Sequence, residues 1–235
     1  MSLTFPNEST EYRTARNALL IKEIELRRAT EAVAAARRAL PLGGALPEDY
    51  RFEELDAASA VRSVKLSELF GGNDALAIYS YMFGPERDKP CPMCTPLLDG
   101  LNGVEDHIRQ RVSLVVVAQS PAERLWQWAR TRGWQRLRLL SCATSNYNND
   151  YHGKTPRGDT TMLNVFRRAG SEVRHFWGSE LAYGPSDPGQ DPRGLDTLNP
   201  VFQMFDLTPV GREKWYTKLQ YEVVGVRGQQ AVAAS

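Results

Sequence analysis

The segment from Arg111 to Gln119 (RVSLVVVAQ) constrains the fold most, because it is an almost uninterrupted run of β-branched and aliphatic residues. A strand with two apolar faces is typical of a sheet that is covered on both sides, as in α/β proteins with parallel strands. A half-exposed strand would instead alternate apolar and polar residues. The segment therefore predicts a buried central strand with helices packed above and below it.

Helices and strands are predicted to alternate around this segment. The expected order is a strand over Ala75 to Phe83, a helix from Pro92 to Gln110, the apolar strand, a helix from Ser120 to Arg132, and a strand over Leu137 to Ser141. This order requires parallel strands joined by right-handed crossovers. Further on, Thr160 to Arg168 and Glu172 to Trp177 predict an antiparallel hairpin. Shorter extended pieces are expected near Tyr50 to Phe52 and Val61 to Leu66, and a helix near Leu195 to Phe205.

A separate long helix is predicted from about Ser9 to Leu40. Apolar side chains recur there at intervals of seven, with alanines filling the seam between them: Leu19, Leu26, Val33, Leu40, Ala15, Ala29 and Ala36. Such a seam packs either on its own domain or against a second copy of the chain, and both remain open. We expect a helical arm at 1–46, a main domain at 47–215 and a tail at 216–235.

Composition and charge argue against two classes of partner, nucleic acids and membranes. The 29 basic and 28 acidic side chains leave a net charge of +1, so no overall field favours nucleic acid or an anionic membrane surface. The first residues lack the pattern of a signal peptide, and the longest strongly apolar run, Leu114 to Ala118, is too short to span a bilayer. Three cysteines are too few for a secreted disulfide scaffold. The sequence predicts a cytoplasmic protein without nucleic-acid or membrane partners.

Cys91-Pro92-Met93-Cys94 is the motif that carries chemistry. Its first cysteine is placed directly before a predicted helix, where free N–H groups and the positive end of the helix dipole favour a thiolate. Pro92 suits a first helical position. Arg87 and Lys89 add positive charge nearby and are predicted as electrostatic support.

The spacing of the two cysteines predicts thiol–disulfide exchange. Cys91 is expected to attack a disulfide and Cys94 to resolve the resulting mixed disulfide. A C-x-x-C motif between a strand and the helix of a β-α-β unit that ends in a hairpin is the thioredoxin-like arrangement. This chemistry requires a thiol or disulfide substrate and no cofactor.

Several segments resemble a bacterial family of thioredoxin-like proteins of unknown function, usually described as predicted dithiol-disulfide oxidoreductases. The resemblance spans about Glu11 to Trp215 and is carried by EYRTARNALLIKEIELRRATEAVAAARRALP, VKLSELFGG, YSYMFGPERDKPCPMCTPLLDGLNG and FDLTPVGREKW. It implies a thioredoxin-like fold, with the paired cysteines at the active site. We therefore expect an α/β protein with a central mixed sheet flanked by helices, preceded by the long N-terminal helical arm that the heptad pattern predicts. It implies no particular substrate.

The sequence departs from thioredoxins at the segment expected to face the cysteines. Thioredoxins have a cis-proline before that strand, whereas Gly158 to Met162 contains none. Thr160 or Thr161 is predicted to occupy this place and to line the cleft. Lys89-Pro90 also stands where thioredoxins have a tryptophan.

Three other interpretations of the motif remain open. His107 follows Cys94 after twelve residues, which suits three ligands of a zinc site, and only the fold can bring a fourth ligand from Cys142, His152 or His175. A thiol peroxidase would oxidise Cys91 to a sulfenic acid and resolve it with Cys94. The Pro-x-x-x-Thr-x-x-Cys pattern of peroxiredoxins is absent, however. The third alternative is a thioredoxin-fold binding or dimerisation protein without catalysis.

Cys142 stands apart from the motif, at the end of an apolar strand. We interpret it as a small buried hydrophobic residue, with a regulatory thiol as the alternative.

Overall fold

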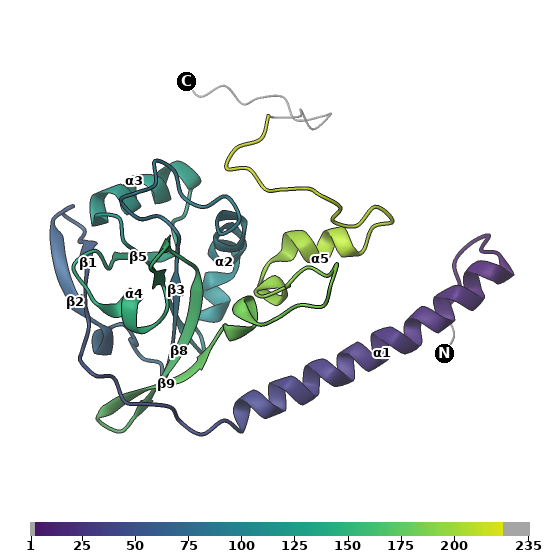
Figure 1. The fold of residues 1–235 in the computed structure, drawn as a ribbon, viewed down its shortest axis with the longest axis horizontal. Helices are drawn as coiled ribbons and strands as arrows, with labels where there is room; N and C mark the ends of the chain where they lie inside the picture. Colours follow the sequence, from purple (N-terminus) through teal and green to yellow (C-terminus); the bar gives the residue numbers. More distant parts are fainter. Residues whose placement is uncertain (1–2, 223–235) are drawn as a thin grey trace. The chain divides into compact units, whose positions relative to one another are not determined.

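The computed structural model describes residues 3–222, which form two compact units (Figure 1). The first unit extends to Gly43 and the second begins at Gly44. Most of the tail predicted at 216–235 lies outside the described residues.

The first unit consists mainly of α1 (Thr10–Arg38), and the long N-terminal helix is thereby confirmed. The Ser9 hydroxyl caps the helix by accepting a hydrogen bond from the Tyr12 N–H at 3.1 Å. No residue of α1 is buried, so its apolar seam is exposed. Charged residues interrupt the helix throughout, and no helix in the described part of the chain is long and apolar enough to cross a bilayer.

The second unit contains a mixed sheet with helices on it. Within residues 3–222 the main sheet has seven strands, in the order β2-β1-β5-β4-β3-β8-β9. Its strands are β1 (Arg51–Leu55), β2 (Val61–Lys65), β3 (Ala75–Ser80), β4 (Ser113–Ala118), β5 (Arg138–Ser141), β8 (Met162–Ala169) and β9 (Glu172–Gly178). The helices are α2 (Thr95–Ile108), α3 (Ala122–Arg132), α4 (Tyr147–Asp150) and α5 (Pro200–Asp206). Short elements complete the unit: β6 (Lys154–Thr155), β7 (Gly158–Asp159), η1 (Leu66–Glu68), η2 (Glu180–Tyr183) and η3 (Asp196–Leu198).

The strand pairing confirms the predicted fold class. β3, β4 and β5 run parallel, with α2 and α3 as their connections. β8 pairs antiparallel with β3, and β9 pairs antiparallel with β8. A β-α-β unit followed by an antiparallel hairpin on the same sheet, with a C-x-x-C motif after the first strand, is a thioredoxin-like fold.

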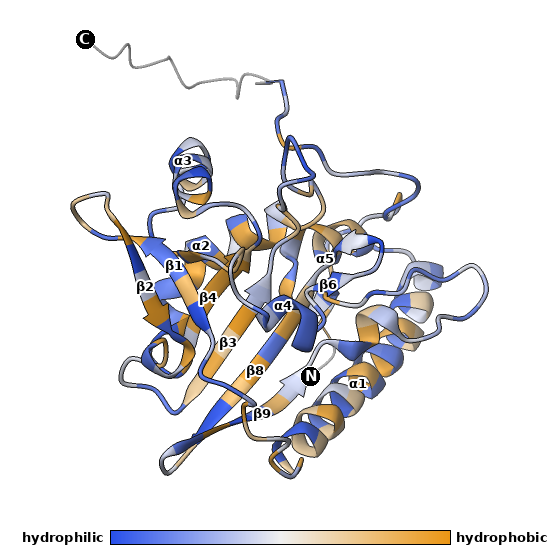
Figure 2. Ribbon diagram, turned by 60° about the vertical axis from the view of Figure 1, so that its left-hand side comes forward, coloured by the Kyte–Doolittle hydropathy of each residue, from blue (hydrophilic) through white to orange (hydrophobic). Residues whose placement is uncertain are grey.

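The two faces of the sheet carry separate hydrophobic clusters, because successive side chains of a strand point to opposite faces. Leu76, Ile78 and Val115 belong to the cluster that includes Tyr147 of α4. The cluster on the other face contains the cysteine pair and side chains of α2 and α3. Figure 2 shows hydrophobic residues along the central strands β3 and β4. The prediction from RVSLVVVAQ of a strand buried on both faces is therefore confirmed.

Two helices differ in their bounds from the prediction. α2 begins at Thr95 rather than at Pro92, because the residues before it form a turn closed by the Thr95 N–H and the Cys91 carbonyl at 3.3 Å. The helix expected near Leu195 to Phe205 is split into η3 and α5. Asn199 separates them with an extended backbone and caps α5 by accepting from the Val201 N–H at 3.1 Å. A proline disfavours helical backbone geometry at the residue before it, and Asn199 precedes Pro200, which explains the break.

The central position of β3 leads to a stability prediction. Leu76 is fully buried there, and its replacement by alanine leaves a cavity in the core. We expect Leu76→Ala to lower the free energy of unfolding by about 2–5 kcal/mol in urea denaturation. Val61→Ala on the edge strand β2 is the control, because Val61 is 47% exposed. Equal losses in the two variants would contradict this description of the core.

Candidate active site

The cysteine motif lies in the turn between the end of β3 and the start of α2. The Cys91 N–H donates to the Met82 carbonyl at 2.9 Å, which joins the motif to the chain that leaves β3. Cys94 is the N-cap residue of α2, and its carbonyl accepts from the Leu98 N–H at 3.2 Å. Because α2 begins three residues later than predicted, Cys94 and not Cys91 occupies the end of the helix.

A chain of hydrogen bonds holds this turn from below. The Trp128 indole donates to the Tyr81 hydroxyl at 3.1 Å, and that hydroxyl lies 2.8 Å from the Thr95 hydroxyl. The Thr95 hydroxyl donates in turn to the Cys91 carbonyl at 2.9 Å. The Tyr81 hydroxyl must then donate to Thr95, so every donor in the chain is used. This network ties α3, α2 and the segment that follows β3 to the backbone of the first cysteine.

Three hydrogen-bond donors point at the Cys91 sulfur. Cys91 is buried, with only 8% of the residue exposed. Its pKa nevertheless falls to about 6, chiefly because the Cys94 thiol donates a hydrogen bond to its sulfur. Burial opposes this shift, the N–H groups of Cys94 and Met93 support it, and the Arg87 charge adds to it. Cys91 is therefore the thiolate of the pair near neutral pH.

Cys94 keeps its proton. Its pKa is raised well above the ordinary thiol value, first because its thiol is the donor to Cys91 and second because it is buried. Cys94 is only 4% exposed, and the fully buried hydroxyl of Tyr79 on β3 lies beside it. The two sulfurs thus hold one proton between them, and the structure has them as free thiols.

The loop before the motif is held by two charged side chains. Arg124 of α3 donates to the carbonyls of Gly84, at 3.3 Å, and Arg87, and its guanidinium lies 4.2 Å from the centre of the Phe83 ring. Asp159 of β7 accepts from the Gly84 N–H at 2.8 Å and from Arg87 Nε at 2.7 Å. Arg87 is thereby positioned near Cys91. Lys89, the other predicted helper, is exposed.

The two predicted cleft threonines face different cavities. Thr161, Cys94 and Tyr79 line a cavity of about 300 Å³. Its far wall comes from the C-terminal segment: Asp196, Asn199, Phe202 and Arg212. Arg212 pairs there with Asp196 and with Asp206 at 2.6 Å, which holds this segment beside the second cysteine. Thr160 instead lines a larger cavity on the other side.

Cys142 and His107 lie apart from the pair. Cys142 is fully buried in the opposite core cluster, and burial raises its pKa to about 12, so the prediction of a buried hydrophobic residue is confirmed. His107 is exposed near the far end of α2. The part of the chain that the structure describes contains no group of three or more His, Cys, Asp or Glu side chains placed to hold a metal ion.

Sequence reasoning missed Tyr79, Tyr81, Thr95, Arg124 and Asp159. Two of them carried a usable signal. Tyr79 and Tyr81 are spaced two apart on the strand that leads to the motif, so they point to the same face as the following helix. Arg124 and Asp159 are 35 positions apart in sequence, and only the fold brings both of them to the loop at Gly84.

A family match places these residues in context. The family described as "Bacterial protein of unknown function (DUF899)" matches residues 2–227. The chain belongs to this family. The resemblance to a bacterial family of unknown function is confirmed in that respect, whereas the oxidoreductase activity implied by it stays a prediction. No curated protein matches the sequence significantly.

The solved structures that this chain matches include peroxiredoxins and a thioredoxin. Peroxidoxin BcpB from Mycobacterium tuberculosis is 16% identical at a TM-score of 0.43, over 70% of this chain and 97% of that one. The mitochondrial 2-Cys peroxiredoxin from Plasmodium falciparum is 13% identical at a TM-score of 0.44, over 70% of this chain and 95% of that one. The exposed lipoprotein thioredoxin Etrx1 from Streptococcus pneumoniae is 13% identical at a TM-score of 0.37, over 64% of this chain and 98% of that one. Similarity this low does not bear on chemistry, which rests on the residues above.

The hydrogen bonds to Cys91 lead to a pH prediction. Iodoacetamide should alkylate Cys91 with a rate that rises around pH 6, because the thiolate is the reactive form. Cys94→Ala removes the main donor, so the midpoint should move to higher pH. Arg109→Gln, on an exposed side chain at the far end of α2, is the control and should leave the midpoint unchanged. An unchanged midpoint in Cys94→Ala would show that the second thiol does not stabilise the first.

Proposed function

We propose that this chain is a dithiol–disulfide oxidoreductase in which Cys91 is the nucleophile and Cys94 the resolving thiol. The observation that carries the proposal is the placement of two free, buried thiols together in the turn between β3 and α2. The Cys94 thiol donates to Cys91 there, and the pKa values of the two thiols shift in opposite directions. Such an arrangement supplies an attacking thiolate and, beside it, a protonated thiol that is released for the second step.

The reaction takes two exchanges. The Cys91 thiolate attacks one sulfur of a substrate disulfide, forms a mixed disulfide and displaces the other sulfur as a thiolate. Cys94 then attacks the Cys91 sulfur while its proton passes to a departing thiolate. The substrate gains two electrons and leaves as one thiol, which carries the Cys94 proton, and one thiolate, which takes a proton from water. The cysteine pair becomes a disulfide. An external thiol reductant returns the pair to its starting state, and no cofactor takes part.

The residues around Cys91 support this assignment. Arg87 favours the thiolate through its charge, and the chain of hydrogen bonds from Trp128 to the Cys91 carbonyl keeps the motif in position.

We also propose that the protein acts in the cytoplasm, where thiols are mostly kept reduced. The substrate is a thiol or disulfide compound.

The test is trapping of the mixed disulfide with dithiobis(nitrobenzoate). The wild-type protein should release both halves of the reagent, because Cys94 displaces the half bound to Cys91. Cys94→Ser should release one half and retain the other as a stable adduct. Cys91→Ser should react slowly, because the remaining thiols are protonated and buried.

Cys142→Ala is the matched control and should behave as the wild type does, because Cys142 lies in the opposite core cluster. Mass spectrometry identifies the modified residue. An adduct on Cys94 in the wild type, or no difference between Cys94→Ser and the wild type, would contradict the assigned roles.

Peroxide reduction is a second candidate, favoured by the 8% exposure of Cys91, which admits a small oxidant more easily than a bulky disulfide. The Cys91 thiolate would be oxidised to a sulfenic acid, and Cys94 would form the disulfide with release of water. The test measures the rate at which the protein consumes hydrogen peroxide and the rate at which it consumes a small disulfide. Dithiothreitol is the reductant in both assays, and the two rates are compared. Faster turnover of peroxide would replace the first proposal by the second, and no turnover of either would leave a binding or dimerisation protein.

We also propose that α1 pairs with α1 of a second copy. Its seam residues Leu19, Leu26 and Val33 are 48%, 68% and 48% exposed and recur at the heptad interval. Sedimentation equilibrium at micromolar concentration should give the mass of a dimer, and Leu26→Glu should give that of a monomer. The surface variant Glu25→Gln is the control, and a monomeric wild type would contradict the pairing.

A further inference from the structure

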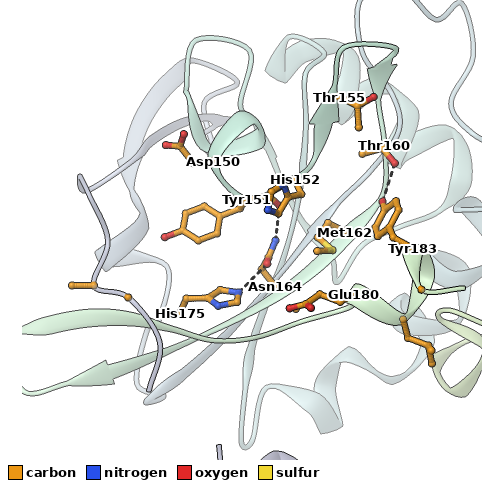
Figure 3. A pocket seen from close by; sticks show the side chains of 15 residues that line it. Asp150, Tyr151, His152, Thr155, Thr160, Met162, Asn164, His175, Glu180 and Tyr183 are labelled. Carbon is orange, nitrogen blue, oxygen red and sulfur yellow. Dashed lines mark hydrogen bonds between the residues drawn. The ribbon is translucent and has the colours of Figure 1, made fainter. Parts of the chain in front are cut away.

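Thr160 lines a second cavity, of about 1020 Å³ (Figure 3). Its neighbour Thr161 lines the separate cavity beside Cys94. Most small-molecule sites have volumes of about 300–1,000 Å³, so the second cavity can hold a ligand. Six of the residues that line it carry the argument: Asp150, Tyr151, His152, Asn164, His175 and Glu180. The proposed thiol chemistry uses none of them.

The hydrogen bonds of Asn164 determine the state of His175. Asn164 is 2% exposed, and its Nδ2 donates to the Tyr151 carbonyl at 3.0 Å, so its Oδ1 faces His175 Nε2 at 3.0 Å. That oxygen accepts only, and therefore Nε2 carries the proton. Burial lowers the pKa of His175 although the Glu180 charge opposes this shift, so the ring is neutral above the ordinary range of histidine. Its Nδ1 is left as a hydrogen-bond acceptor.

The backbone at His152 is held in a costly conformation next to this cavity. His152 has φ of 57°, in the left-handed region that side chains other than glycine rarely adopt. Gly153 follows it in tight packing, because a Cβ there would lie 2.3 Å from Asn148 Oδ1 and 2.6 Å from Ser80 Oγ. The buried packing of Gly153 thus places the His152 ring on the cavity wall. Such strain is a pointer to function.

The charges of the cavity have one sign. Among the residues that the structure describes, the carboxylates of Asp150 and Glu180 line it and no lysine or arginine does. Within residues 3–222, Asp150 accepts hydrogen bonds from two neutral groups, the Tyr50 hydroxyl at 2.5 Å and the Asn146 amide at 2.9 Å. No hydrogen bond or ion pair joins the Glu180 carboxylate to another described residue. Figure 3 shows the two carboxylates on opposite sides of the cavity.

We propose that this cavity binds an aliphatic diamine or polyamine, with one ammonium group at Glu180 and a second at Asp150. An ammonium group is a donor at all its hydrogens, which matches a wall of carboxylates and a neutral histidine acceptor. The carbon chain between the two charges passes over apolar surface from Met162, Leu181 and Gly178. The cavity thereby selects for charge sign and for two charges in one molecule.

The test is isothermal titration calorimetry of the full chain with hexane-1,6-diamine. The titration is run at low ionic strength and about pH 8, above the ordinary range of histidine. Hexylamine and hexanedioate, with the same number of carbon atoms, probe the need for two charges and for positive charge. We expect the diamine to bind more tightly than the monoamine and the dicarboxylate not to bind.

The decisive variant is Glu180→Gln, which keeps shape and removes the charge of an exposed side chain, so the fold is preserved. It should weaken binding of the diamine about fivefold, the effect of losing a partly exposed ion pair. Glu123→Gln, on the exposed face of α3, is the matched control and should leave binding unchanged. The proposal is overturned by no saturable binding of the diamine, by equal binding of hexanedioate, or by unchanged affinity in Glu180→Gln. None of these outcomes bears on the thiol chemistry.

Discussion

The parallel pairing of β3 with β4 is the constraint on which the rest of the second unit depends. Both strands are covered on two faces, so the connection between them must cross over the sheet as a helix. The chain therefore leaves β3 at the same edge at which α2 begins, and the cysteine motif fills that turn. Because side chains alternate, Tyr79 and Tyr81 point toward α2 while Leu76 and Ile78 point to the opposite core.

The sharing of one proton between Cys91 and Cys94 follows from their burial. A sulfur anion without partners is costly in an apolar environment, and the fold offsets this cost with a thiol donor and two backbone N–H groups. The same arrangement prevents the ionisation of Cys94, since a second negative charge beside the first is unfavourable. One geometry thus gives the two cysteines opposite reactivities, although they have the same chemistry in the unfolded chain.

The segment Thr160–Thr161 divides two cavities of different character. On the side of Cys94, Arg212 and Arg193 are paired with aspartates, which balances the charge of the cavity wall. On the other side, the carboxylates of Asp150 and Glu180 have no cationic neighbour among the lining residues. The Tyr183 hydroxyl donates a hydrogen bond to the Thr161 carbonyl and lies 2.9 Å from the Thr160 hydroxyl. These two contacts hold the dividing segment in place.

Local patterns in the sequence determined the elements: the apolar run of β4, the turn residues of the β8–β9 hairpin, the Ser9 cap of α1 and the position of the cysteine pair after a strand. These features depend on residues a few positions apart, so spacing reveals them. Only the tertiary structure decided that Cys94 caps α2 and donates to Cys91, that Asp159 and Arg124 hold the loop, and that Asn164 and His175 meet across the β8–β9 pair. Cys94 meets Cys91 in this way because α2 begins at Thr95. The other contacts join residues of different elements, and strand register and packing bring them together without leaving a local pattern.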